Sequence, residues 1–224
     1  MIYNIYMLKK MKELWCSFLN VIAPQRSHFE IARNITESEI NDLPRATQVH
    51  DHAWVTALFQ YKHPTVKAII WELKYHENIL PLHYIAPLLY DHMIELMSDV
   101  MMFDGDARFL LIPIPISTER RIMRGYNQSE HIARAIVNQD IAHVMTYAPQ
   151  WFEKIIDTPP QSHTASKAER MYNLNKCFRA DPRVQNTYVI LIDDVVTTGS
   201  TLSEARKTLL EAGAKNVYAF TIAH

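Results

Sequence analysis

The chain has 224 residues and a formal net charge of −1; 48% of its residues are hydrophobic and 21% are charged. These proportions are typical of a folded globular protein. The charge near zero excludes a general attraction to nucleic acid or to an anionic membrane, although a local basic patch stays open. Two cysteines, Cys16 and Cys177, are too few for a disulfide framework and suit a reducing compartment. No apolar run is long enough to cross a bilayer, so we expect a cytoplasmic protein without membrane insertion.

Residues 1–52 are predicted to form an N-terminal helical segment. Five apolar residues recur at helical spacing near the start: Leu8, Met11, Trp15, Phe18 and Ile22. They predict an amphipathic helix within residues 1–24. A targeting segment is the alternative, but the apolar stretch is short and no small-residue cleavage site follows it. Thr36 and Glu39 then form a capping box that predicts a short helix.

From residue 53 onward, predicted strands alternate with predicted helices. Strands are predicted at 53–62, 108–116, 151–156, 188–195 and 216–224, with a returning strand at 176–180. Helices are predicted at 63–77, 82–100, 127–139 and 200–214. A polar connection at 158–174 is too long for an ordinary turn. The alternation predicts an α/β fold in which helices flank a mostly parallel sheet.

The stretch VILIDDVVTTGSTL, residues 189–202, contains the strongest functional signal. A buried strand runs into two carboxylates, Asp193 and Asp194, and then into a hydroxyl-rich turn before a helix. Ligands of such folds bind beyond the carboxyl ends of the strands, and helix N-termini bind phosphate. Gly199 permits close backbone approach, but the spaced glycines and lysine of nucleotide loops are missing. The pattern suits a sugar phosphate, with both carboxylates facing a pocket. A capped turn whose acids merely face water is the alternative.

The pattern from Ile190 to Thr201 resembles the 5-phosphoribosyl-1-pyrophosphate (PRPP) signature of type I phosphoribosyltransferases. Three further blocks resemble the ComF/GntX family: YKHPTVKAIIWELKYHEN with Tyr61, Lys74 and Tyr75; LIPIPISTERRIMRGYNQSEHIA; and TPPQSHTASKAERMYNLNKCF with Gln161, Arg170, Asn173 and Phe178. The resemblance covers about residues 53–224. It implies a type I phosphoribosyltransferase fold: a sheet core with a small hood from the N-terminal half.

The resemblance also implies roles for individual residues. PRPP would be bound by Asp193, Asp194, Val195, Val196, Thr197, Thr198, Gly199, Ser200 and Thr201. Pyrophosphate would be bound by Arg120, Arg121, Arg124 and Lys167, and the catalytic set would be Asp193, Asp194 and Arg170. Mg²⁺ would be held mainly through PRPP, without a direct protein ligand. The arginines could instead form a solvated basic loop or a patch for single-stranded nucleic acid, and Lys167 could be an ordinary charge in a loop.

The N-terminal segment departs from the family. Members commonly begin with a four-cysteine zinc ribbon, whereas Cys16 is the only thiol near this position, so residues 1–52 are expected to replace the ribbon and no zinc is predicted. His50 and His52 could form a metal pair on one face of a strand, but a solvated strand edge is the favoured interpretation because no third ligand is placed by spacing.

Two functional hypotheses follow from these motifs. In the preferred one, the protein transfers 5-phosphoribosyl from PRPP, or from a ribose 5-phosphate-type ligand, to an unknown acceptor with release of pyrophosphate. In the alternative, it is a non-catalytic accessory of competence and DNA uptake that binds single-stranded DNA or a competence-protein partner, with the PRPP site regulatory. Whether the chain is an enzyme stays open, as does a homodimer.

Overall fold

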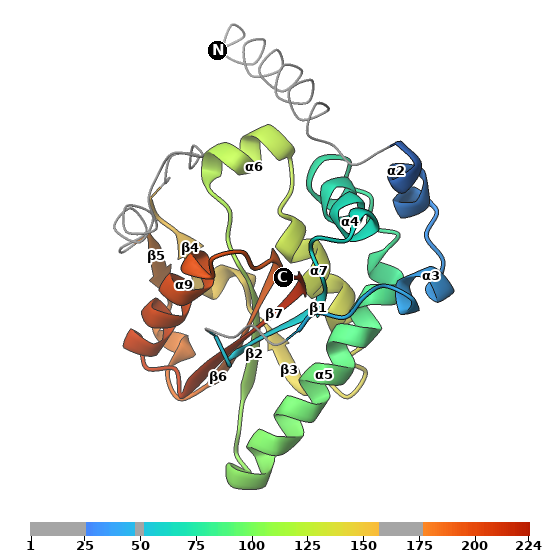
Figure 1. Cartoon of the computed structure of the whole chain (residues 1–224). Coiled ribbons are helices and arrows are strands. Elements are labelled where there is room, and N and C mark those ends of the chain that lie inside the picture. The colour runs from blue at the N-terminus through green and yellow to red at the C-terminus, as the bar shows by residue number, and fades with distance from the viewer. Residues whose placement is uncertain (1–25, 48–51, 157–176) are drawn as a thin grey trace, which may run out of the picture.

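The computed structural model describes residues 26–47, 52–156 and 177–224 (Figure 1). Two predicted segments, the helix within residues 1–24 and the polar connection at 158–174, lie outside the described residues. So do four of the residues for which roles or family matches were expected: Gln161, Lys167, Arg170 and Asn173.

A five-stranded sheet lies at the centre of the described part of the chain, with strand order β1-β7-β6-β2-β3. Its strands are β1 (Val55–Phe59), β2 (Phe109–Pro113), β3 (Met145–Tyr147), β6 (Tyr188–Val195) and β7 (Asn216–Ala223). Each neighbouring pair in this sheet is parallel. The predicted α/β class with a mostly parallel sheet is therefore confirmed.

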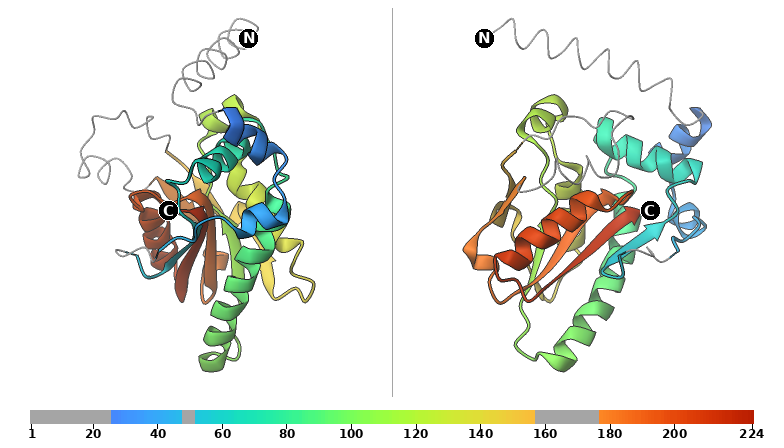
Figure 2. Two further views of the ribbon diagram at one scale, coloured as in Figure 1. Left: turned by 45° about the vertical axis from the view of Figure 1, so that its right-hand side comes forward. Right: turned by 60° about the vertical axis from the view of Figure 1, so that its left-hand side comes forward.

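Helices cover both faces of the sheet, as the two views of Figure 2 show. Helices α5 (Leu82–Phe103) and α7 (Gln128–Val137) lie on one face and α9 (Ser200–Glu211) on the other, and α4 (Pro64–Tyr75) extends the first of the two cores. On β6, Ile190 and Ile192 pack into the core with α5 and α7, whereas Val189 and Leu191 pack into a second core with α9. Each such side chain contributes about 1.5–3 kcal/mol when it is fully buried, which explains why β6 reads as an unbroken apolar run.

The N-terminal helices α2 (Arg26–Arg33) and α3 (Glu37–Asn41) pack beside this core. The predicted capping box of α3 is confirmed, because Thr36 accepts from the Glu39 backbone while the Glu39 carboxylate accepts from the Thr36 backbone. Helix α2 was not predicted, and it packs against α4.

The predicted strands at 151–156 and 176–180 do not join the main sheet. They form a separate antiparallel pair, β4 (Phe152–Lys154) and β5 (Phe178–Ala180), with the 3₁₀ turns η1 (Pro149–Trp151) and η2 (Pro182–Val184) beside them. The stacked rings of Phe152 and Phe178, with centroids 4.9 Å apart, hold the pair together. The first strand is shorter than predicted because Trp151 belongs to η1 and because Ile155 and Ile156 lie beyond its end.

The direction of the chain across the sheet reverses at the β2–β6 boundary. From β2 the chain moves outward through α7 to β3, and from β6 it moves the other way through α9 to β7. Ligands of open α/β sheets bind at such a reversal, beyond the carboxyl ends of the strands. The acid pair, Asp193 and Asp194, lies near the end of β6 and therefore beside this boundary.

Candidate functional site

The acid pair is held by side chains from two helices. Asp193 Oδ1 accepts hydrogen bonds from Ser129 Oγ of α7 at 3.0 Å and from the Asp194 backbone N–H at 2.9 Å. Asp194 is only 4% exposed, and its Oδ2 lies 3.0 Å from Lys74 Nζ of α4. The expectation that both carboxylates face a pocket is therefore wrong for Asp194, which is buried against an ammonium group.

These surroundings shift two pKa values in the same direction. Burial, and after it the charge of Asp194, raises the pKa of Asp193 to about 7, against the opposing influence of Lys74. Burial alone would lower the pKa of Lys74, but the carboxylates of Asp194 and Asp193 outweigh it and leave the pKa raised. Asp193 thus holds a proton more readily than an isolated carboxyl does.

The turn after the acid pair, residues 195–201 and called here the phosphate loop, leads directly into α9. Gly199 is the N-cap of α9 with a left-handed φ of +70° and makes no side-chain cap. The Thr198 hydroxyl lies 2.8 Å from the Ser200 hydroxyl and accepts a long hydrogen bond, 3.5 Å, from the Ser200 N–H. The predicted helix start near Ser200 is confirmed, and the N–H groups of a first helical turn can bind an anion.

His52 lies against the phosphate loop, a position that no sequence pattern predicted. A Cβ atom built on Gly199 would lie 2.4 Å from His52 Nε2, so glycine is required here both by φ and by the imidazole ring. The strand-edge interpretation of the two histidines is wrong for His52, which precedes β1; His50 lies outside the described residues. His52 also contacts the edge of the Trp54 ring, at a centroid distance of 5.6 Å.

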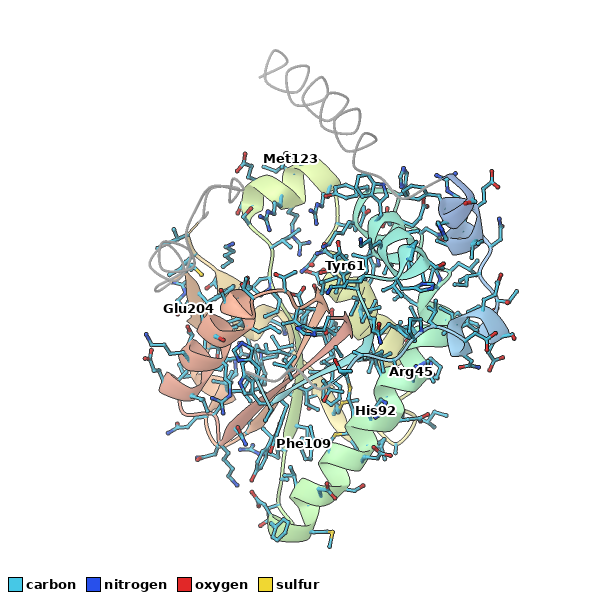
Figure 3. All side chains as sticks on the ribbon, in the orientation of Figure 1. Arg45, Tyr61, His92, Phe109, Met123 and Glu204 are labelled. Atoms are coloured by element: carbon cyan, nitrogen blue, oxygen red, sulfur yellow. The ribbon has the colours of Figure 1, made fainter. Side chains whose placement is uncertain are left out.

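The three arginines after β2 lie on a helix, α6 (Thr118–Arg124), where no helix was predicted. Figure 1 shows α6 beyond the end of the sheet, and Met123 marks it in Figure 3. Arg120 and Arg121 are exposed, and Arg121 pairs with Glu130 of α7. Arg124 instead lies over the Tyr75 ring, 5.3 Å from its centroid. The structure therefore divides the arginines between solvent and the end of α4.

The start of α7 is fixed to both β2 and α4. Asn127 caps α7, accepting from the Ser129 N–H at 3.0 Å and donating to the Ile114 carbonyl at 3.0 Å. Tyr126 accepts from the Glu77 backbone N–H at 2.9 Å, just beyond α4. These contacts place Ser129, and through it Asp193, relative to the end of β2.

Sequence reasoning missed Lys74, Ser129 and His52 as neighbours of the site. Lys74 was noted only as part of a family block, and its distance from Asp194 in sequence hid the ion pair. The position of Ser129 at the start of α7, the second helix after β2, was the available signal for its contact with β6. No pattern in the sequence pointed to the contact between His52 and Gly199.

A cavity of about 580 Å³ lies away from the acid pair, between β1 and α5. Arg45 and His92, labelled in Figure 3, belong to its lining, together with Asp91 and Glu95. The charged residues that line this cavity are of both signs and none of them is buried. The acid pair therefore remains the better candidate site. Among the described residues there is no group of three potential metal ligands, and no helix is long and apolar enough to span a membrane.

No protein-family model matches the chain. It is similar to the DNA utilization protein YhgH of Salmonella typhi, with 34% identity over 109 residues, which are 48% of this chain and 45% of that protein. It is similar to the competence protein ComFC of Bacillus subtilis, with 34% identity over 120 residues, 52% of this chain and 45% of that protein. The competence protein F of Haemophilus influenzae is 31% identical over 117 residues, which are 50% of this chain and 49% of that protein. Each match thus spans about half of this chain and about half of the relative.

Proposed function

We propose that the chain, which is similar over about half of its length to competence proteins of the ComF family, binds PRPP at the end of β6 and transfers the 5-phosphoribosyl group to an acceptor. One observation supports this most: the acid pair at the β2–β6 boundary is followed by the phosphate loop and the N-terminus of α9. A ribose 5-phosphate carries two vicinal hydroxyls and one phosphate, and these groups match the two parts of the site in order along the chain.

In the proposed complex the phosphate loop donates backbone N–H groups and hydroxyls to the 5′-phosphate. Asp193, the more accessible acid, accepts from a ribose hydroxyl. Asp194 adds negative charge that Lys74 only partly offsets. During transfer, the bond between C1 and the pyrophosphate oxygen breaks, pyrophosphate leaves with the electron pair, and a lone pair of the acceptor forms the new bond to C1. The acid pair stabilises the cationic character that develops on the ribose in between.

Mg²⁺ would supply charge neutralisation on the departing pyrophosphate. The described residues suit a metal that arrives with its ligand, because they contain no group of three potential metal ligands and Lys74 already engages Asp194. Arg120 and Arg121 are the exposed cations nearest in sequence to the end of β2, and in this proposal they contact pyrophosphate oxygens. Arg170 and Lys167 keep the roles expected from the resemblance, outside the described residues.

The test combines binding with turnover. Ribose 5-phosphate and Mg²⁺-PRPP are titrated calorimetrically into the protein, and pyrophosphate release is followed with a panel of nucleobases and ammonia. We expect both ligands to bind and at least one acceptor to release pyrophosphate. Failure of both ligands to bind would overturn the proposed site, whereas binding without turnover on any acceptor would overturn the transferase step alone.

A second candidate is the accessory function, favoured by the names of the relatives and by the exposed arginines of α6. Here α6 would bind single-stranded DNA and the acid pair would bind a regulatory ligand. Binding to the phosphate backbone by these arginines should weaken steeply with salt. DNA affinity that falls with salt and is lost in an Arg120→Gln, Arg121→Gln double variant, without pyrophosphate release, would favour this function over transfer.

A further inference from the structure

Lys74 is the third charge at the acid pair, and neither the motif nor the proposed transfer assigns it a role. Helix α4 brings its ammonium within 3.0 Å of Asp194 Oδ2, and the two side chains are 25% and 5% exposed. A buried carboxylate needs a proton, an ammonium group or a metal ion as its partner. In this chain the ammonium takes that place.

A second lysine of the same helix shows what distinguishes Lys74. Lys67 lies two turns earlier, is exposed, and places its ammonium 6.0 Å from the centroid of the Tyr61 ring. Lys67 therefore adds a positive charge to α4 without contacting either acid. Of these two lysines, only Lys74 contacts a carboxylate oxygen. Its side chain is also largely shielded from water, so water screens its charge less than that of Lys67.

We infer that Lys74 is a built-in counter-ion that keeps free divalent cations off the acid pair, so that a metal enters only together with a phosphorylated ligand. Adjacent carboxylates would otherwise supply the oxygen ligands that hard cations prefer. The ammonium group blocks this in two ways, because it engages Asp194 Oδ2 and repels a second cation. The exclusion of free metal is inferred from the contact between Lys74 and Asp194. The entry of metal together with a ligand rests on the proposed function.

The inference is tested by titrating Mn²⁺ alone, at pH 7.5, into the full chain and into Lys74→Met, which keeps the side-chain length and removes the charge. We expect the unsubstituted protein to show no saturable binding at low millimolar Mn²⁺. Lys74→Met should gain one site at least about tenfold tighter. Its melting temperature should rise with Mn²⁺ concentration, because a ligand that binds only the folded state stabilises it. Lys67→Met is the matched control and should behave like the unsubstituted protein.

A further variant tests whether the Mn²⁺ site gained in Lys74→Met lies at Asp194. Adding Asp194→Asn to Lys74→Met should remove the Mn²⁺ binding, since it removes the carboxylate that Lys74 had neutralised. If Lys74→Met does not fold, Lys74→Gln, which keeps an N–H donor, takes its place in every arm. Equal Mn²⁺ affinity in the unsubstituted protein and the neutral variant would overturn the inference. So would a gained site that survives Asp194→Asn.

Titration of ribose 5-phosphate in parallel keeps the two proposals distinguishable. If the unsubstituted protein binds no sugar phosphate while the neutral variant gains the Mn²⁺ site, the proposed function fails and the exclusion of free metal stands. If sugar phosphate binds and the Mn²⁺ result is negative, Lys74 is not a metal-excluding group and the proposed function stands.

Discussion

The acid pair and helix α6 lie at the same end of the sheet but are built differently. Asp193 and Asp194 are held by partners on α7 and α4, and one of them is buried. Helix α6 has no buried residue, and two of its three arginines are exposed. The difference teaches that one half of the proposed site is fixed before any ligand arrives. The other half holds charges whose side chains must still be ordered at an entropic cost.

Asp194→Asn should have the largest effect on stability. In the proposed complex Asp194 supplies charge and makes no hydrogen bond to the ribose, so ribose 5-phosphate binding should weaken by less than about tenfold. The change leaves Lys74 without its carboxylate. Breaking a buried pair costs about 3–5 kcal/mol, and partial exposure of Lys74 reduces this to roughly 2 kcal/mol. Calorimetry and denaturant unfolding measure the two effects. Unchanged stability would mean that this half of the site is no more fixed than α6.

Gly199→Val should abolish binding of 5′-phosphorylated ligands while leaving most of the fold intact. The new side chain would meet the His52 ring and would force a β-branched residue to a φ of +70°. Gly105→Val is the control, since a Cβ there meets no atom within 4 Å. Adding His52→Ala removes the contact with the ring but keeps the backbone strain. Recovery of ribose 5-phosphate affinity in that double variant would show that displacement of His52, and not the loop conformation, had blocked binding.

Asp193→Asn should alter the pH dependence of stability. The folded-state pKa of Asp193 is raised to about 7 from an ordinary 3.8, so the fold favours the protonated carboxyl. Ionisation of Asp193 does not change the free energy of unfolding below pH 4. It lowers this free energy increasingly from pH 4 to 7, and the loss stays constant above pH 7. The variant should therefore gain about 1–3 kcal/mol relative to the unsubstituted protein above pH 7, and nothing below pH 4. Urea unfolding at several pH values measures this.

Arg120→Gln should have the smallest effect and should separate two ligands. An exposed cation contributes about 0.2–1 kcal/mol, so PRPP affinity should fall roughly two- to fivefold. Ribose 5-phosphate lacks the pyrophosphate, and its affinity should not change. Arg179→Gln, an exposed arginine on β5 that pairs with Glu153, serves as the control. Equal losses for both ligands would place Arg120 near the 5′-phosphate and would contradict the division between the two halves.

The sequence predicted the half of the site that depends on local pattern. An apolar run followed by two acids, a glycine and a helical period places β6, the acid pair and the start of α9 in order, because all three are neighbours in the chain. The α5 and α7 helices were predicted from the same kind of pattern. The capping box of Thr36 and Glu39 was predicted because capping needs only residues one turn apart.

The features that were not predicted either join residues far apart in the chain or leave only a weak pattern in the sequence. The Lys74–Asp194 pair and the His52–Gly199 contact join residues far apart in the chain, and only the packing of α4 and of the segment before β1 brings them together. Strand β3 is three residues long and lies at a sheet edge, where a period of two can hardly be read. Helix α6 did carry signals: Ser117 caps its start and Gly125, with a φ of +86°, ends it.

The pairing of β1 with β7 has a consequence for how the protein is made. Val55 lies beside Ala219 in the sheet, and the Tyr61 N–H donates to the His224 carbonyl. At 5–20 residues per second, a ribosome that has completed β1 needs on the order of 10 s to reach β7. During that interval the inner edge of β1 has no partner and its apolar side chains have no core. The nascent chain is thus exposed to wrong pairing at this strand, and synthesis speed, chaperone capture and temperature should affect the yield of native protein more than its equilibrium stability would suggest.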